Sequence, residues 1–215
     1  MTDLAEILDS RAARLAFKIA GAVAAAAVLV AAGWLWMRTE DAHGQAALAA
    51  AADLVQQAEG PQATPEVRQR AITSLQQVLA EHGRTSAAPV AAYQLGNLQY
   101  QAGDYAAARG AYELALAKGA SGSVRTLAAS GVGYTWEAQK DYANAVTAYD
   151  ALVRHESPKQ FFFEESLLDL ARAQALAGKP ADAIATYERL LKDAPDSRRA
   201  PDVRARIAEL QGKRS

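Results

Sequence analysis

The 215-residue sequence contains no cysteine, and only 7% of its residues are aromatic. Without cysteine, the chain can have no disulfide bonds, zinc–thiolate sites, thiol catalysis or lipidated-cysteine anchor. Its 23 basic and 24 acidic residues nearly cancel. The basic excess typical of nucleic-acid-binding proteins is therefore missing, and we expect no nucleic-acid partner.

Residues able to do chemistry are also sparse. The three histidines, His43, His82 and His155, lack the spacing of metal ligands. The sequence contains no Gly-x-Ser-x-Gly, Walker or zinc motif. We therefore expect no catalytic, cofactor-binding or metal-binding residues, no small-molecule substrate and no enzymatic activity.

Alanine supplies a large part of the 51% hydrophobic content. Because alanine loses no side-chain entropy in a helix, it is the best helix former, and its small side chain lets helices approach closely. The composition predicts an all-α protein with tight helix–helix packing.

A long apolar run extends from Ile19 to Met37 without a charged residue. As a helix it would be about 28 Å long, close to the hydrocarbon thickness of a bilayer. Trp34 and Trp36 lie near its end, as is typical of the headgroup level. The run predicts a transmembrane helix over 19–37.

Basic residues are denser before this run than after it. Arg11, Arg14 and Lys18 precede the run, and Arg38 alone follows it closely. The positive-inside rule places residues 1–18 in the cytoplasm and the C-terminal part outside it. Two alternatives remain open: a signal peptide cleaved near Ala42-His43-Gly44, and a buried core helix of a soluble protein.

After residue 85 the sequence repeats itself. Three similar copies run from Leu95 to Leu116, from Val132 to Val153 and from Leu170 to Leu191. Two small positions and one tyrosine align at offsets of 37 and 38 residues: Gly96, Gly133 and Ala171, then Ala108, Ala145 and Ala183, then Tyr112, Tyr149 and Tyr187. Such a period indicates stacked helical hairpins.

The residue types fit this interpretation. We expect the small positions to lie where the two helices of a hairpin come closest, and each tyrosine to fill the gap towards the next hairpin. Turns are expected at 103–104, 140–141 and 178–179. No hairpin can bury its faces alone, so the copies must stack.

This pattern resembles the tetratricopeptide repeat, which is small at its eighth and twentieth positions and aromatic at its twenty-fourth. Pro195 matches the proline near the repeat's end. The period is longer than the usual 34 residues, and Ala92, Ala129 and Leu167 replace the tryptophan common at the fourth position.

The predicted fold class is therefore an all-α chain with an N-terminal transmembrane helix followed by a tetratricopeptide-repeat solenoid. We expect the repeat domain at 41–215. A degenerate first copy around Ala71 gives four repeats near 45–82, 88–118, 124–154 and 161–194, with a capping helix at 200–211.

The inner faces of the first helices are where such arrays usually hold partners. By alignment, those positions carry Tyr93, Asn97, Tyr100, Tyr134 and Arg172. Tyrosine and arginine beside polar groups make a plausible peptide groove. The alternative is a solvated face that contacts nothing.

Phe161-Phe162-Phe163 is the largest apolar cluster outside the N-terminal run. A helix offers only part of its surface to a neighbour. We therefore expect one or two of these side chains to pack and a third to be exposed.

The overall layout resembles the bitopic ancillary subunit of the SecYEG translocon (the YfgM-like family). This resemblance implies a single-pass protein of the inner membrane with a periplasmic repeat domain, which passes secreted chains from the translocon to periplasmic chaperones. Alternatives are another envelope scaffold similar to the periplasmic cell-division coordinator, or a secretion or pilus assembly factor.

Overall fold

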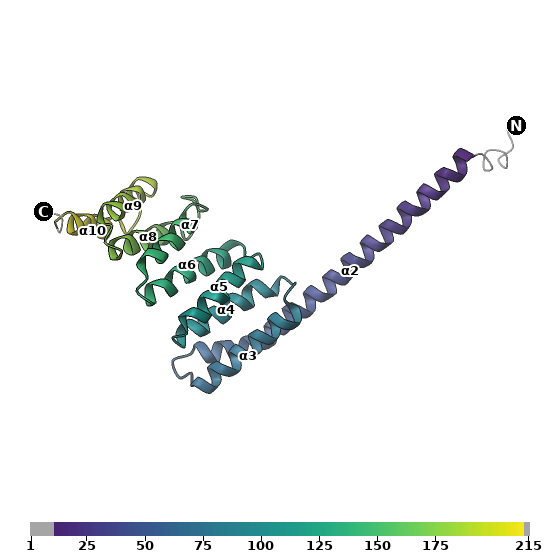
Figure 1. Ribbon diagram of the computed structural model, residues 1–215, viewed down its shortest axis with the longest axis horizontal. Coiled ribbons are helices and arrows are strands. Elements are labelled where there is room, and N and C mark those ends of the chain that lie inside the picture. The colour runs from purple at the N-terminus through teal and green to yellow at the C-terminus, as the bar shows by residue number, and fades with distance from the viewer. Residues whose placement is uncertain (1–10, 213–215) are drawn as a thin grey trace. The chain divides into compact units, whose positions relative to one another are not determined.

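The computed structural model describes residues 11–212, and this part of the chain contains helices and no strands (Figure 1). The expected all-α fold is confirmed. The chain divides into two compact units, Met1–His43 and Gly44–Ser215. The predicted cytoplasmic segment, residues 1–18, lies largely outside the described residues.

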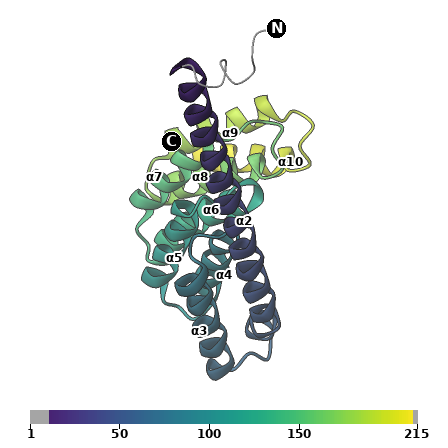
Figure 2. The same cartoon turned by 90° about the vertical axis from the view of Figure 1, so that its right-hand side faces the viewer.

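Nine helices are described between residues 11 and 212. They are α2 (Arg11–Glu59), α3 (Pro65–His82), α4 (Ala87–Gln101), α5 (Tyr105–Ala117), α6 (Gly122–Ala138), α7 (Tyr142–Val153), α8 (Phe163–Leu176), α9 (Pro180–Asp193) and α10 (Ala200–Gly212). From α3 to α10, each helix packs on the next one along the chain (Figure 1 and Figure 2).

The first unit contains the apolar part of helix α2. The most apolar 18-residue window of this helix has a mean hydropathy of 2.2, and none of it is buried. By length and composition the helix can cross a membrane.

Helix α2 does not stop at the predicted end of the span. It continues through Met37 to Glu59, because the sequence between these residues contains no proline and only one glycine, Gly44. The hydroxyl of Thr39 donates to the carbonyl oxygen of Trp36 at 2.8 Å, inside the continuous helix.

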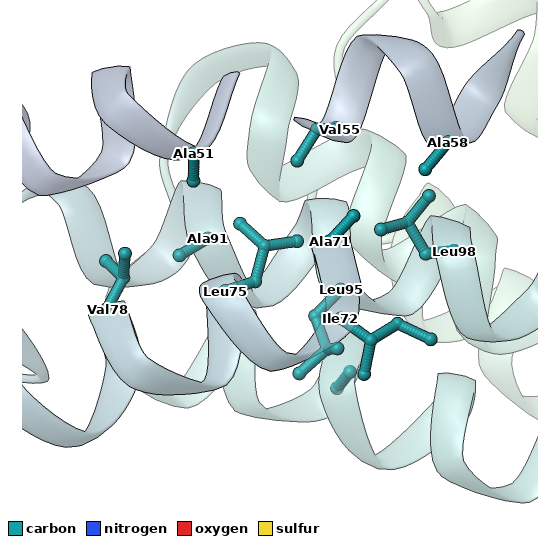
Figure 3. Packing of buried hydrophobic residues seen from close by; sticks show 11 residues of the cluster. Ala51, Val55, Ala58, Ala71, Ile72, Leu75, Val78, Ala91, Leu95 and Leu98 are labelled. Atoms are coloured by element: carbon teal, nitrogen blue, oxygen red, sulfur yellow. The ribbon is translucent and has the colours of Figure 1, made fainter. Parts of the chain in front are cut away.

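The second unit begins with the last turns of α2 packed on α3. Ala51, Val55 and Ala58 of α2 are buried together with Ala71 and Leu75 of α3 (Figure 3). Ala51, Val55 and Ala58 are three or four positions apart and so share one face of α2, where the small alanines let the two helices approach closely. Helix α3 begins at Pro65, and the side chain of Thr64 caps it by accepting from the backbone N–H of Val67.

The turn inside each of the three clear hairpins has the same form. Gly103, Lys140 and Gly178 have φ of 81°, 61° and 73°, so each occupies the left-handed region just after a first helix. This conformation satisfies the last carbonyl groups of the helix. Asp104 and Asp141 then cap the second helices, each accepting a backbone N–H at 3.1 Å.

Tyrosine rings fill the space that the small positions leave. A Cβ on Gly96 would lie 2.6 Å from the ring of Tyr112, and one on Gly131 in the next hairpin would lie 2.7 Å from the same ring. A Cβ on Gly133 would lie 2.2 Å from the ring of Tyr149. The glycines therefore make room for an aromatic ring, and Tyr112 contacts its own hairpin as well as the next one.

The phenylalanine cluster divides as expected. Phe163 is fully buried, Phe162 is half-buried, and Phe161 is 91% exposed. The cluster lies where the long connection between α7 and α8 ends, so only its last member belongs to a packed helix.

Candidate protein-docking face

The five residues predicted to bind a partner all lie on first helices. Tyr93, Asn97 and Tyr100 are on α4, Tyr134 is on α6, and Arg172 is on α8; each is half-buried. We call the surface that carries them the first-helix face. Each side chain therefore combines an exposed part with contacts inside the chain.

On α4, the polar group of Asn97 already has a partner. The hydroxyl of Tyr112 donates to the Asn97 Oδ1 at 2.9 Å. Burial raises the pKa of Tyr112, which keeps this donor protonated. Tyr93 packs against the Tyr112 ring, with 6.0 Å between centroids, and Tyr100 meets Tyr105 edge to face at 5.2 Å.

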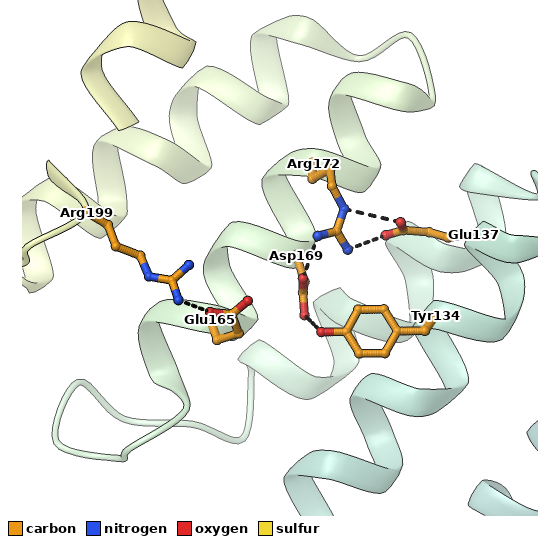
Figure 4. Close-up of polar contacts among 6 residues, drawn as sticks. All are labelled: Tyr134, Glu137, Glu165, Asp169, Arg172 and Arg199. Carbon is orange, nitrogen blue, oxygen red and sulfur yellow. Dashed lines mark hydrogen bonds and ion pairs between the residues drawn. The ribbon is translucent and has the colours of Figure 1, made fainter. Parts of the chain in front are cut away.

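A polar network joins α6 to α8 (Figure 4). The Tyr134 hydroxyl donates to Asp169 Oδ2 at 2.6 Å. Arg172 forms an ion pair with Asp169 Oδ1 at 2.9 Å and donates through Nε and Nη2 to both carboxylate oxygens of Glu137, at 3.2 and 2.9 Å. The network therefore links the first helices of two successive hairpins.

Asp169 is the central residue of this network and was not predicted. Its side chain is fully buried. Desolvation raises the pKa of Asp169, against the opposing effects of the Tyr134 hydrogen bond and the Arg172 charge. The sequence contains one signal of this role: Asp169 is an acidic residue inside the apolar run Leu167–Leu170. An acidic residue buried in such a run requires a polar partner.

The polar groups of Tyr134 and Arg172 are already bonded within the chain, which limits the contacts that they could make with a partner protein. Desolvation is the largest effect raising the Tyr134 pKa, followed by its hydrogen bond to Asp169. Desolvation disfavours the charged form of Arg172, but the hydrogen bonds that Arg172 donates to Glu137 and the charge of Asp169 outweigh it and raise the Arg172 pKa. Both side chains thus hold hairpins together, and only their exposed surfaces remain for docking.

Beyond Arg172, the first-helix face opens into a groove. This C-terminal groove lies between α8 and α10, over α9, and has a volume of about 730 Å³. Its apolar lining includes Leu168, Ala175, Leu176, Pro180, Tyr187, Val203 and Leu210. Leu176 is 49% exposed, so a bound side chain could still cover it.

The charged rim of the C-terminal groove is balanced. Three acidic and three basic residues line it: Glu165, Asp202, Glu209, Arg172, Arg199 and Arg206. Arg199 pairs with Glu165 at 2.7 Å (Figure 4), and Arg206 pairs with Glu209 at 2.9 Å. Because the arginines are already paired, the groove fits an apolar segment of low net charge better than a strongly acidic one.

Sequence reasoning missed the contribution of α10. The predicted capping helix at 200–211 corresponds to α10, and its exposed residues Arg206 and Glu209 also line the groove. Val203 is buried as an apolar closing face requires. The separation of α8 and α10 depends on the connection between α9 and α10, and no pattern in the sequence predicts that separation.

Comparison with known families identifies the repeat. Family models described as tetratricopeptide repeat match residues 68–124, 93–161 and 137–207. No curated protein sequence matches the chain significantly.

Several solved structures share the fold. A putative kinesin light chain with nearly identical repeats from Podospora anserina has a TM-score of 0.59 at 16% identity, covering 79% of this chain and 87% of its own. The pilF protein of Pseudomonas aeruginosa has a TM-score of 0.57 at 18% identity, covering 82% and 71%. YrrB, described as having an unusual peptide-binding site, has a TM-score of 0.53 at 16% identity, covering 68% and 69%.

Proposed function

Because the chain belongs to the tetratricopeptide-repeat family, with models matching from residue 68 to residue 207, we propose that it is a membrane-anchored scaffold binding other proteins in the bacterial envelope. The observation that carries this proposal is the C-terminal groove. It continues the first-helix face, and its floor of leucine, valine and tyrosine is the kind of surface that buries a partner's apolar side chain.

The proposed partner is an extended segment of another protein. Tyr93, Tyr100 and Tyr134 present half-buried rings along the first helices, which gives contact area at a small cost in side-chain entropy. YrrB, which shares the fold, is described as having a peptide-binding site. An extended segment could lie along these rings and place one apolar side chain in the groove.

The apolar part of α2 supports the anchor. Its window of mean hydropathy 2.2 is not buried, as suits a helix surrounded by lipid. The basic residues before the span favour a cytoplasmic N-terminus, with the repeats in the periplasm. The layout resembles that of the ancillary SecYEG subunit, so we assign the scaffold to the translocon's exit side, where it passes secreted chains to chaperones.

Photo-crosslinking tests this assignment. A photoreactive residue is placed at Leu176 in the groove and, in a matched control, at the exposed Thr147 on the second helix α7. In intact membranes, we expect crosslinks to translocon subunits, secreted chains or periplasmic chaperones from Leu176 only. Crosslinks from Leu176 to cell-division or pilus-assembly proteins would support the alternative envelope scaffolds, and equal products from both sites would exclude the groove.

Topology is tested separately. Protease added to spheroplasts should digest the repeats, and mass spectrometry of the purified protein should show an intact N-terminus. Complete protection of the repeats would reverse the orientation, and a mature N-terminus near Gln45 would show that the apolar segment is a signal peptide.

A further inference from the structure

The most exposed large apolar side chain described in the second unit lies outside the first-helix face and the C-terminal groove. Among the described residues of Gly44–Ser215, two large apolar side chains are exposed: Leu176, which lines the C-terminal groove, and Phe161. Phe161 is 91% exposed, whereas Leu29, the most exposed large apolar side chain described in the apolar helix, is 73% exposed.

Phe161 is the tip of a small aromatic pair on a long connection. The chain between α7 and α8 runs from Arg154 to Phe162, the longest connection between described helices. Phe161 and Phe162 meet edge to face with 5.0 Å between centroids. Phe162 is half-buried and the next residue, Phe163, is fully buried, so a packed helix end supports the pair.

Exposed cations lie near this pair, together with one acidic residue, Glu156. Lys159 lies two residues before Phe161, and Arg125 lines the same shallow cavity of about 270 Å³ as Phe161 and Phe162. Arg154, with 75% of its side chain exposed, begins the connection and pairs with Asp150 at 2.6 Å. An aromatic tip with lysine and arginine beside it matches the interface of an anionic bilayer, where rings enter the headgroup level and cations meet phosphate.

We propose that the 154–162 connection is a second membrane contact, which inserts Phe161 into the headgroup region of an anionic lipid surface. This inference rests on the proposed anchor, because the anchor keeps a bilayer within reach. A single aromatic side chain binds lipid too weakly to hold a free protein, but tethering raises the effective concentration of the surface into the millimolar range. A weak contact is then populated.

The test uses the 215-residue chain, which contains no cysteine, in vesicles. A single cysteine at Phe161 is labelled with an environment-sensitive fluorophore, and the protein is reconstituted in phosphatidylethanolamine with phosphatidylglycerol. A blue-shifted emission that spin-labelled lipid quenches is expected at Phe161. A label at Gln62, exposed in the connection between α2 and α3, should stay in water.

The charge dependence gives a second readout. A cation near an anionic surface is attracted to it and favours the embedded state. Lys159→Gln should therefore lower the ratio of embedded to solvated label about fivefold. Replacing phosphatidylglycerol by phosphatidylcholine should have at least this effect. An unchanged ratio in both cases would overturn the assignment to anionic lipid.

A label at Val28 in the apolar helix separates the two proposals. A solvated label at Val28 would contradict the anchor itself. An embedded Val28 with a solvated Phe161 would overturn only the second contact. If Phe161 is solvated in pure lipid and becomes protected only when native membrane proteins are added, its partner is a protein and the lipid assignment is wrong.

Discussion

The hydroxyl of Tyr134 lies 2.6 Å from the carboxylate of Asp169, thirty-five residues further along the chain. The two residues belong to the first helices of neighbouring hairpins, so this hydrogen bond crosses the interface between repeats. Since Asp169 is buried and Arg172 is its other partner, any change at Tyr134 or Arg172 is expected to weaken hairpin stacking, whatever its effect on the proposed docking.

Removing the Tyr134 hydroxyl should therefore lower stability. Tyr134→Phe keeps the ring but leaves one oxygen of a buried carboxylate unpaired, so we expect the free energy of unfolding to fall by about 1.5–3 kcal/mol. Denaturant titration of the full chain in detergent, followed by circular dichroism, measures the change. Tyr142→Phe is the matched control and should change stability little; equal losses would mean that the Asp169 hydrogen bond contributes nothing.

Asp169 should also make stability depend on pH. Burial raises its pKa above the ordinary value of 3.8, so its contribution to stability is fully present below the unfolded pKa and is lost as pH rises through the folded pKa. Against an Asp169→Asn reference, which cannot titrate, the wild-type chain should lose relative stability over this window and then level off. A relative gain with rising pH would show that Arg172 and Tyr134 outweigh desolvation.

Alanine at two glycines should be costly for different reasons. Gly133→Ala places a Cβ 2.2 Å from the Tyr149 ring, and overpacking of this kind costs about 1–3 kcal/mol. Gly119→Ala meets no atom, but its φ of 87° costs an L-residue about 1–2 kcal/mol. Tyr149→Leu should reduce the penalty of Gly133→Ala and leave that of Gly119→Ala unchanged; melting curves of the three single and the two double variants show whether it does.

One turn should be improved by glycine. Lys140 holds the left-handed position that Gly103 and Gly178 hold in the other hairpins, so Lys140→Gly should raise the unfolding free energy by about 0.5–1 kcal/mol. Lys118, just after α5, has a φ of −79°, and Lys118→Gly should give no gain. A loss in the Lys140 variant would mean that its side chain outweighs the backbone strain.

The repeat pattern predicted the hairpins because it records local packing. Small positions such as Gly96 and aromatic positions such as Tyr112 recur at the repeat period, and each has the same steric role in its own hairpin. The turns followed for a similar reason: a left-handed residue ends the first helix of each clear hairpin, and in two of the three an aspartate then caps the second helix.

The contacts of the docking face could not be predicted in this way. The partnership of Tyr134 with Asp169 depends on how two hairpins stack, and the position equivalent to Asp169 in the preceding copy is Gly131. The C-terminal groove likewise depends on where α10 lies after a short irregular connection. The binding roles of Tyr93, Asn97, Tyr100, Tyr134 and Arg172 remain predictions.

The ring of Tyr112, seated between Gly96 and Gly131, limits how this array can evolve. The ring and the glycine that makes room for it belong to two different hairpins. A hairpin can therefore be duplicated or lost only where the new neighbours still fit each other. The next interface offers Asp169 where Gly131 stands, so the two junctions are not interchangeable. Duplicating the middle hairpin would bring its Tyr149 against a second copy of Gly131, which already accommodates a tyrosine ring. Duplicating the last hairpin would bring its Tyr187 against a second Asp169, and the carboxylate of that residue would need another tyrosine as its partner. Gain or loss of repeats is therefore expected at the first of these junctions.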